Sequence, residues 1–167
     1  NKMGPRKELD SFFNYEITPG FSTPDWAKGA VFYQIYVDRF SNGDPSNDVL
    51  DREYIYIGEP VTRVTDWNKY PAKMGVREFY GGDLQGVLDK LDYIKSLGVE
   101  VIYFNPLFVS PSNHKYDIQD YDYIDPHFGR IINDSEKTVA AGESNRDARS
   151  YITRVTDRVN LEASNAF

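Results

Sequence analysis

The hydrophobic and polar positions between Tyr80 and Phe108 predict a helix followed by a buried strand. Asp83 precedes the helical pattern, at a position where a carboxylate can accept from free amide groups. Gly98 follows the pattern, where a left-handed residue ends a helix. We therefore predict one helix over residues 83–97. Its apolar side chains recur three and four residues apart, as expected of a helix with one face on a core: Val87, Leu88, Leu91, Ile94 and Leu97.

Two apolar segments predict strands on either side of this helix. Val99–Phe104 is almost continuously apolar, as in a strand buried on both faces of a parallel sheet, and Pro106 ends it. Val31–Val37 is rich in β-branched and aromatic residues and gives way to polar residues at Asp38. The second strand leads into a polar and aromatic loop, residues 110–125. A helix feeding a parallel strand that opens into such a loop is typical of a βα-repeat enzyme scaffold.

The rest of the chain predicts loops and the start of one more helix. Residues 1–25 contain Thr-Pro-Gly and Thr-Pro, and we interpret them as a tail or as a linker from an upstream domain. Residues 54–76 have little periodicity, and Asn160 is placed to cap a last helix from Leu161. Two strands and one complete helix fall short of the eight units and ~250 residues of a parallel barrel. Residues 26–167 are therefore predicted to be the truncated first part of a larger barrel.

Composition excludes several functional classes. The 167-residue chain has 19 Lys and Arg against 26 Asp and Glu, a formal net charge of -7, which argues against a general nucleic-acid binder. No apolar run approaches the ~18 residues that a membrane helix needs. The absence of cysteine excludes disulfides and thiolate metal sites. The 13 tyrosines suit sugar recognition, although tyrosine also fills the boundary between core and surface.

An acidic, amide-rich loop after the first strand offers the oxygen ligands that Ca²⁺ prefers. The Gly81 carbonyl and Asp83 are placed to complete such a site. The spacing is not that of an EF-hand, and from composition alone a hydrophilic turn held by Asx hydrogen bonds is the favoured interpretation of these residues. The candidate ligands in the loop are Asn42, Asp44, Asn47 and Asp48.

A second candidate site lies beyond the carboxyl end of the second strand, the face on which βα barrels carry their active sites. Tyr116 has a ring that can stack on a sugar, and His114 and Asp117 can hydrogen-bond its hydroxyls. The alternative is a loop held together by internal hydrogen bonds. Four similar carboxylates follow in this loop, so their number does not identify a catalytic pair for glycoside cleavage: Asp117, Asp120, Asp122 and Asp125.

Three separated motifs, in this order, resemble the opening of the catalytic domain of the alpha-amylase superfamily of glycoside hydrolases. They are VFYQIYVDRFSNGDPSND, YGGDLQGVLDKLDYIKSLGVEVIYFNPLF and SPSNHKYDIQDYDYIDPHFG, and together they cover about residues 26–129. The chain is most similar to the neopullulanase, cyclomaltodextrinase and maltogenic amylase group. The resemblance implies the N-terminal part of a (β/α)8 TIM barrel, with residues 31–37 as its first strand, 83–97 as its first helix and 99–105 as its second strand.

The resemblance also implies roles for individual residues. Tyr116 falls on the tyrosine of the H-x-Y motif that stacks on the sugar next to the scissile bond, with His114, Asp117 and Asp120 in the same wall. Lys115 stands between His and Tyr, where many amylases have Gly. The acidic loop and the G-G-D motif resemble a structural calcium site, with the ligands Asn42, Asp44, Asn47, Asp48, Gly81 through its carbonyl, and Asp83.

The function implied is hydrolysis or transfer of α-glucosidic bonds by a retaining mechanism, on a starch-like α-glucan or maltooligosaccharide. The family's nucleophilic Asp and acid/base Glu are expected beyond Phe167, so no carboxylate of this chain is predicted to be catalytic and the chain alone is predicted to be inactive. The remainder of its own barrel is the partner that its open sheet edges need. The alternative is a non-catalytic barrel that serves carbohydrate binding or protein assembly.

Overall fold

The computed structural model describes residues 17–135, 137–147 and 149–167, and the chain forms two compact units, Asn1–Ala30 and Val31–Phe167. The first unit contains the predicted linker, of which residues 1–16 lie outside the described part. Its described residues include one short 3-10 helix, η2 (Asp25–Ala27). No helix among the described residues is long and apolar enough to cross a membrane. The remainder of this subsection concerns the second unit.

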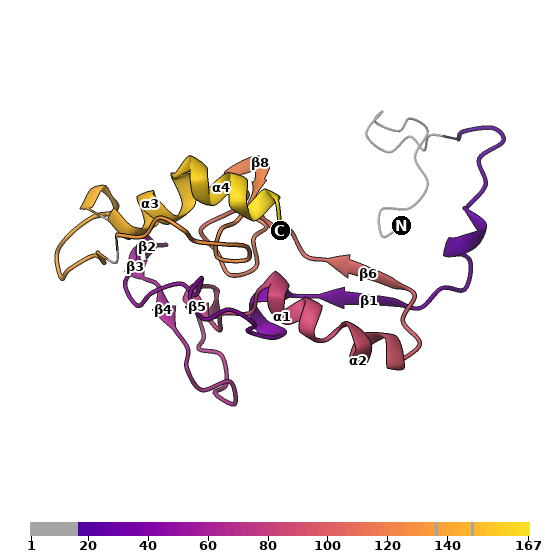
Figure 1. Ribbon diagram of the computed structural model, residues 1–167, viewed down its shortest axis with the longest axis horizontal. Helices are drawn as coiled ribbons and strands as arrows, with labels where there is room; N and C mark the ends of the chain where they lie inside the picture. The colour runs from indigo at the N-terminus through magenta and orange to yellow at the C-terminus, as the bar shows by residue number, and fades with distance from the viewer. Residues whose placement is uncertain (1–16, 136, 148) are drawn as a thin grey trace, which may run out of the picture. The chain divides into compact units, whose positions relative to one another are not determined.

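The two strands predicted on either side of the helix are present in the second unit and pair in parallel. β1 (Phe32–Ile35) pairs with β6 (Val101–Phe104), with Phe32 opposite Val101 (Figure 1). β1 is shorter than predicted because the chain turns into the 3-10 helix η3 (Val37–Arg39). Asp38 lies in η3, where its buried carboxylate accepts from the backbone N–H of Tyr80 at 3.1 Å and stabilises the turn that ends the strand.

The prediction of a single helix is wrong, because α1 (Leu84–Asp89) and α2 (Leu91–Ser96) are separated at Lys90. The Lys90 N–H donates to the carbonyl of Val87, three residues back, which breaks the α-helical ladder. Both predicted ends are confirmed. Asp83 caps α1 by accepting from Gly86 N–H at 2.6 Å, and Gly98 has a φ of 77° after the end of α2.

Only one face of the strand pair is covered by described elements. Val87 and Ile94 from the helices pack against Ile35, Val37 and Phe128 to form the core beneath β1 and β6. On β6, Tyr103 is 58% exposed, so the prediction of a strand buried on both faces is wrong for the residues described. Three of the five apolar helix positions are also exposed: Leu88, Leu91 and Leu97. The sequence therefore contains more apolar side chains on the strand and helices than the described elements bury.

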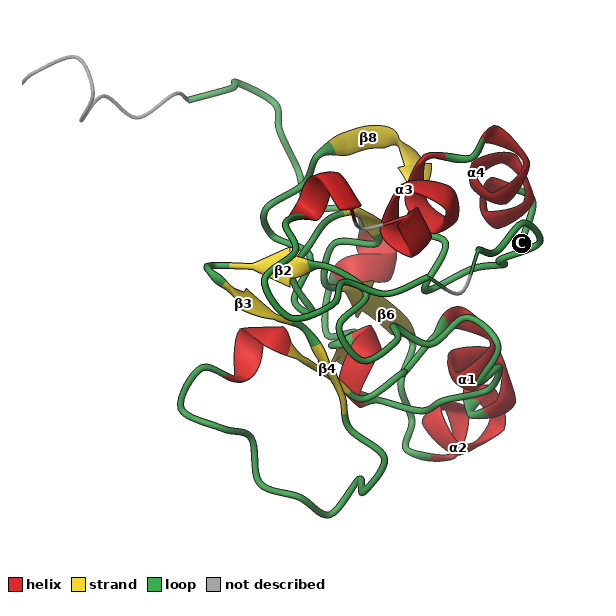
Figure 2. Cartoon of the chain, turned by 90° about the vertical axis from the view of Figure 1, so that its left-hand side faces the viewer, coloured by secondary structure: helices red, strands yellow, loops and turns green. Residues whose placement is uncertain are grey.

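The connection between β1 and α1 contains short elements that its lack of periodicity did not predict. β2 (Ile55–Tyr56) and β3 (Glu59–Pro60) form a hairpin that leads into β4 (Thr62–Arg63) (Figure 2). β4 pairs in parallel with β5 (Glu78–Phe79), which follows the 3-10 helix η4 (Gly75–Arg77). Elements of two residues are too short to show alternation in a sequence. They enclose a second core: Val49, Tyr54, Val61, Phe79 and Val139.

The segment after β6 folds back over the carboxyl end of the strands. β7 (Phe108–Val109) and β8 (Asp120–Ile124) are antiparallel, and η5 (Asn145–Asp147), α3 (Arg149–Thr156) and α4 (Arg158–Asn165) follow. The predicted cap at Asn160 is wrong, since Asp157 caps α4 by accepting from Val159 N–H at 2.9 Å. Asn160 instead lies inside α4, where its side-chain oxygen accepts from Ile132 N–H at 2.7 Å.

Candidate functional site

Tyr116 and His114 lie side by side on the turn between β7 and β8. The Tyr116 side chain is 60% exposed, and the centroids of the two rings are 5.9 Å apart at an interplanar angle of 38°. The Nδ1 atom of His114 lies 3.1 Å from the backbone N of Tyr116, which donates to it. Because Nδ1 accepts, the neutral ring carries its proton on Nε2. The turn thus offers an open aromatic face next to an imidazole N–H donor.

Lys115, between these two residues, points in the opposite direction. Its φ of 59° lies in the left-handed region, which costs a non-glycine residue roughly 1–2 kcal/mol. The side chain is almost completely buried, and Nζ donates to Asp125 Oδ2 at 2.5 Å and to the Ser110 carbonyl at 2.9 Å. The backbone at Lys115 is therefore in the conformation that glycine favours. The buried ion pair with Asp125 offsets the strain of placing a lysine there.

Asp117 is held by hydrogen bonds from its own loop and from β2. Its Oδ1 accepts from the hydroxyls of Ser110, at 2.7 Å, and Ser112, and its Oδ2 accepts from the Tyr56 hydroxyl at 2.7 Å. Burial alone would raise the pKa of Asp117, but the hydrogen bonds from Ser112, Tyr56 and Ser110 outweigh burial and lower it. Asp117 is therefore an ionised residue that fixes the turn below Tyr116. Asp120 lies on β8, where its Oδ1 accepts from Asp122 N–H.

A network of buried charges connects this turn to segments far away in the sequence. His127 bridges two carboxylates, with Nδ1 2.8 Å from Asp125 Oδ1 and Nε2 2.8 Å from Glu53 Oε1. Arg154, on α3, donates to Glu53 Oε2 at 3.0 Å, to Asp134 Oδ2 and to the backbone carbonyl of Asp48 at 2.6 Å. Glu53, Asp125, His127 and Arg154 are all buried. The network thus joins the loop after β1, the turn that carries Tyr116, and α3.

The ionisation of this network is set by its pairing. Burial by itself would lower the pKa of His127, but the carboxylates of Glu53 and Asp125 raise it above the ordinary 6.5. Burial would raise the pKa of Asp125, yet Lys115 and His127 hold it well below its usual range. The pKa of Glu53 is likewise lowered, against the effect of burial, by His127 and Arg154. Each group is therefore charged because its neighbours carry the opposite charge.

The candidate metal loop is organised by the carboxylate of Asp83. This carboxylate accepts from the backbone N–H groups of Gly43 at 3.0 Å and Asp44 at 2.7 Å, and from the Asn47 side chain at 3.3 Å, in addition to capping α1. The Nδ2 atom of Asn47 also donates to the Gly129 carbonyl. One buried carboxylate therefore fixes the acidic loop to the start of the first helix, where the sequence predicted a shared site.

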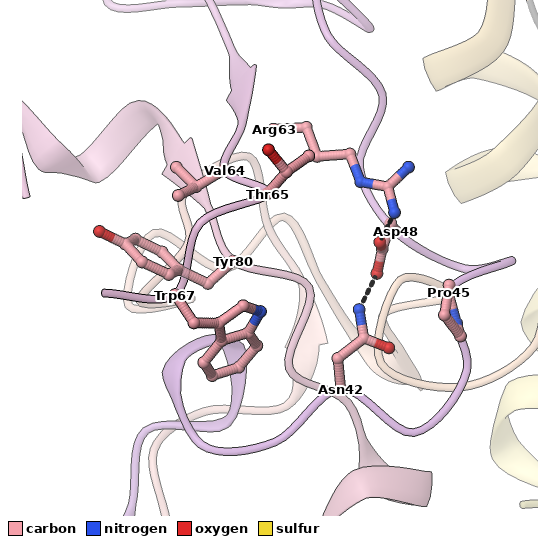
Figure 3. A pocket seen from close by; sticks show the side chains of 8 residues that line it. All are labelled: Asn42, Pro45, Asp48, Arg63, Val64, Thr65, Trp67 and Tyr80. Carbon is pink, nitrogen blue, oxygen red and sulfur yellow. Dashed lines mark hydrogen bonds and ion pairs between the residues drawn. The ribbon is translucent and has the colours of Figure 1, made fainter. Parts of the chain in front are cut away.

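Two amide oxygens in this loop support the fit of a cation. The Oδ1 atoms of Asn42 and Asn47 are buried and have no hydrogen-bond partner among the described residues. The Nδ2 atom of Asn42 donates to Asp48 (Figure 3), and that of Asn47 donates to Asp83. With a cation between the two carboxylates, both amides could turn over and present oxygen to it. The backbone of Gly81 also approaches closely, since a Cβ there would collide with Asp48 Oδ1.

Other contacts limit the fit. Asp44 Oδ1 accepts from the N–H and hydroxyl of Ser46, and Asp48 forms an ion pair with Arg63. Burial raises the pKa of Asp48 to about 6, against the opposing effect of Arg63. In the part of the chain that the structure describes, no three His, Cys, Asp or Glu side chains gather closely enough to hold a metal. A cation here would depend on amide and backbone oxygens together with Asp48 and Asp83, which suits Ca²⁺ rather than a transition metal.

Sequence reasoning missed the buried network. Glu53 and Arg154 are separated by about a hundred positions and belong to segments without periodicity. Only Lys115 carried a signal, because a lysine that replaces glycine in a tight turn needs a compensating contact. His127 lay within a quoted motif, but nothing in the sequence indicated which carboxylates it contacts.

Comparisons with known proteins place most of the chain in one family. Residues 34–146 match the family model described as alpha amylase, catalytic domain. An amylopullulanase of Thermoanaerobacterium saccharolyticum is 46% identical over 146 residues, 76% of this chain and 11% of the relative. Neopullulanase 2 of Thermoactinomyces vulgaris is 51% identical over 111 residues, 66% of this chain and 17% of the relative. The chain thus spans between about a tenth and a fifth of the length of these relatives.

Solved structures agree with these relatives. The cyclic alpha-maltosyl-(1-->6)-maltose hydrolase from Arthrobacter globiformis, in complex with that sugar, matches with a TM-score of 0.54 and 40% identity over 65% of this chain and 21% of that chain. The type III pullulan hydrolase from Thermococcus kodakarensis matches with a TM-score of 0.55 and 31% identity over 80% of this chain and 22% of that chain.

We predict that Lys115→Gly destabilises the protein by about 2–4 kcal/mol, although glycine relieves the left-handed strain. The substitution leaves the buried Asp125 carboxylate without its lysine, and breaking a buried pair costs about 3–5 kcal/mol. The matched control is Ile57→Gly, because Ile57 has a φ of 51° but an exposed side chain. Its free energy of unfolding should stay constant or rise slightly. Equal effects of the two substitutions in denaturant unfolding would contradict the assigned role of the ion pair.

The buried network predicts a stability maximum on the acidic side of neutrality. The raised pKa of His127 means that its contribution is complete below pH 6.5 and is lost as the pH rises through the folded-state value. The pKa values of Asp125 and Glu53 are lowered, so the contribution of these carboxylates to stability is complete above about pH 4.5 and is lost as the pH falls. His127→Gln should lower stability at pH 5.5 by about 3 kcal/mol and flatten the decline above pH 6.5. Thermal unfolding across pH 3–9 tests this, and an unchanged alkaline decline in the variant would contradict it.

Proposed function

Because the chain belongs to the alpha-amylase catalytic-domain family, we propose that the protein carrying it cleaves or transfers α-glucosidic bonds in starch-like α-glucans. In this proposal the second unit is the N-terminal part of a (β/α)8 barrel, with β1 and β6 as its first two barrel strands. The observation that carries the proposal is the open face of Tyr116 beside the His114 donor, on a turn beyond the carboxyl end of β6. The names of the relatives, amylopullulanase and neopullulanase, and the cyclic maltosyl-maltose complex support an oligosaccharide substrate.

The residues of the turn receive distinct roles in sugar binding. Tyr116 stacks on the apolar face of a glucose ring, and His114 donates from Nε2 to a hydroxyl. Asp117 keeps a lone pair on Oδ2, beyond the one that accepts from Tyr56, for a sugar hydroxyl. A stacking ring on an already ordered turn binds more tightly, because ordering the segment on binding reduces affinity. Asp117 and the Lys115–Asp125 pair supply this fixation.

Bond cleavage is assigned to residues outside this chain. A retaining mechanism requires two carboxyl groups about 5 Å apart, one as nucleophile and one as acid and base. In this proposal both carboxyl groups lie on later barrel strands, and the present chain contributes the substrate wall. Three of its buried carboxylates are engaged in structural contacts: Asp38 with the Tyr80–Gly81 backbone, Asp83 with the acidic loop, and Asp125 with Lys115 and His127.

We further propose a structural calcium ion at the acidic loop. The unpartnered oxygens of Asn42 and Asn47, the carboxylates of Asp48 and Asp83, Asp44, and the carbonyl of Gly81 would hold it. The ion would link the loop after β1 to the start of α1 and take no part in bond cleavage. Its binding would require Asp44 to leave Ser46, the contact that it makes in this structure.

The proposed activity predicts hydrolysis of α-glucans by the complete protein and a specific requirement for Tyr116. Tyr116→Ala should lower kcat/KM on a maltooligosaccharide about tenfold or more, because the variant lacks the stacking surface. The matched control is Tyr93→Ala on α2, whose side chain is similarly exposed and lies outside the turn. Reducing-sugar release from starch, pullulan and cyclodextrin measures the activity. A folded protein without activity on any of them would overturn the enzymatic proposal, and equal effects of both variants would remove Tyr116 from the site.

The proposed ion predicts calcium-dependent stability. At a free Ca²⁺ concentration about 100 times the Kd, the chelator-treated protein should gain about 2.7 kcal/mol, seen as a rise in Tm. Asp48→Asn should abolish most of this gain, whereas Asp89→Asn should retain it, because Asp89 is an exposed residue of α1 that contacts Gln85. An identical Tm with Ca²⁺ and with chelator would exclude the ion.

A further inference from the structure

We propose that a pocket next to Trp67 is a second α-glucan-binding site, separate from the turn that carries Tyr116. The pocket has a volume of about 320 Å³, at the lower end of the range for small-molecule sites (Figure 3). It lies between the acidic loop and the connection from β4 to β5. Its lining combines two aromatic rings with several hydrogen-bonding side chains: Asn42, Pro45, Asp48, Arg63, Val64, Thr65, Trp67 and Tyr80.

Trp67 supplies the stacking surface of this site. Its side chain is 40% exposed, although an indole that served only as core would be covered. The ring packs edge-to-face on Tyr80, with centroids 5.8 Å apart at 80°. Tyr80 is itself buried, and its hydroxyl donates to the Lys69 carbonyl at 2.9 Å. The indole is therefore supported from one side and accessible from the pocket, which is the arrangement that a stacked sugar ring requires.

The segment that carries Trp67 is fixed at its base and along its length. Val64 N–H donates to the Phe79 carbonyl at 2.7 Å, beside the β4–β5 pair. The buried Glu78 carboxylate accepts from Ala72 N–H at 2.8 Å and from the Lys69 ammonium. These contacts lie on both sides of the indole in the sequence. A pre-ordered aromatic surface binds with less loss of conformational freedom than a mobile one.

The charges of the pocket favour a neutral ligand. Arg63 is its cation and Asp48 its anion, and the two side chains form an ion pair, so their charges cancel. A phosphate or carboxylate ligand would have to compete with Asp48 for the guanidinium. A neutral sugar can hydrogen-bond to these groups without breaking the ion pair, because its hydroxyls both donate and accept. The polar side chains of Arg63, Thr65 and Asn42 line the pocket. An aromatic face bordered by paired polar groups is thus matched to a carbohydrate.

The choice of an α-glucan as that carbohydrate rests on the proposed function. A second contact on the same polymer would hold it to the protein while Tyr116 engages the bond to be cleaved, and linked contacts raise overall affinity through effective concentration. Asn42 and Asp48 also belong to the proposed calcium ligands. Occupancy of the loop by Ca²⁺ is therefore expected to change sugar affinity at Trp67.

The test is affinity electrophoresis of the complete protein in gels that contain amylopectin. Trp67→Ala should weaken binding about fivefold, and Trp67→Tyr should restore most of it because an aromatic ring is retained. The matched control is Trp26→Ala, which removes the other tryptophan of the chain, itself exposed and in the first unit. It should bind like wild type. Tyr116→Ala should keep the Trp67-dependent retardation and lose activity on short maltooligosaccharides.

The outcomes separate this site from the proposed activity. Retardation that depends on Trp67 in a protein without hydrolytic activity would support the site and overturn the enzymatic proposal. Hydrolysis together with equal retardation of wild type and Trp67→Ala would support the enzymatic proposal and overturn the site at Trp67. Equal retardation in hydroxyethylcellulose would overturn the assignment to α-glucans. Equal Tm values of Trp67→Ala and Trp67→Tyr control for unfolding of the segment. In the complete protein, maltoheptaose should change the tryptophan fluorescence of the wild type more than that of Trp67→Tyr, which still binds but lacks this indole; equal changes in the two proteins would overturn the site.

Discussion

The arrangement of the second unit depends on the neutralisation of buried charge around Asp125. Removing an ion from water costs several kcal/mol, so a buried carboxylate persists only with cations placed against it. Lys115 pairs with one oxygen of Asp125 and His127 with the other. His127 also pairs with Glu53, which in turn pairs with Arg154. Three segments that lie far apart in the sequence are held together in this way. Their apolar contacts alone are modest, because each core comprises only a few buried side chains.

The same network relates the two candidate sites to each other. Arg154 donates to the backbone carbonyl of Asp48 in the acidic loop, and Lys115 lies directly before Tyr116 in the exposed turn. A displacement of the acidic loop would therefore reach the support of Tyr116 through a continuous chain of buried, paired side chains. This continuity gives a physical reason why a structural cation could affect sugar binding without contact between ion and sugar.

The sequence predicted the features that depend on local pattern and missed those that depend on distant contacts. The parallel pair β1–β6, the Asp83 cap and the glycine end at Gly98 follow from hydrophobic spacing and backbone preference, and the structure confirms them. The break at Lys90 and the cap at Asp157 were not predicted, because several residues there satisfy the same local rules. The roles of Glu53 and Arg154 could not be predicted, since their partners are brought together only by the fold. Tyr116 and His114 emerged from a motif, while their orientation depends on the inward turn of Lys115.

The central claim is that Tyr116 is a sugar-stacking residue held by a buried ion pair. The most direct measurement is a crystal structure of the complete protein with a maltooligosaccharide bound. We expect a glucose ring parallel to the Tyr116 ring, a hydroxyl within hydrogen-bond distance of His114 Nε2, and Lys115 buried against Asp125. The absence of a sugar from Tyr116, with its ring covered by other parts of the protein, or Lys115 turned to solvent would contradict the claim.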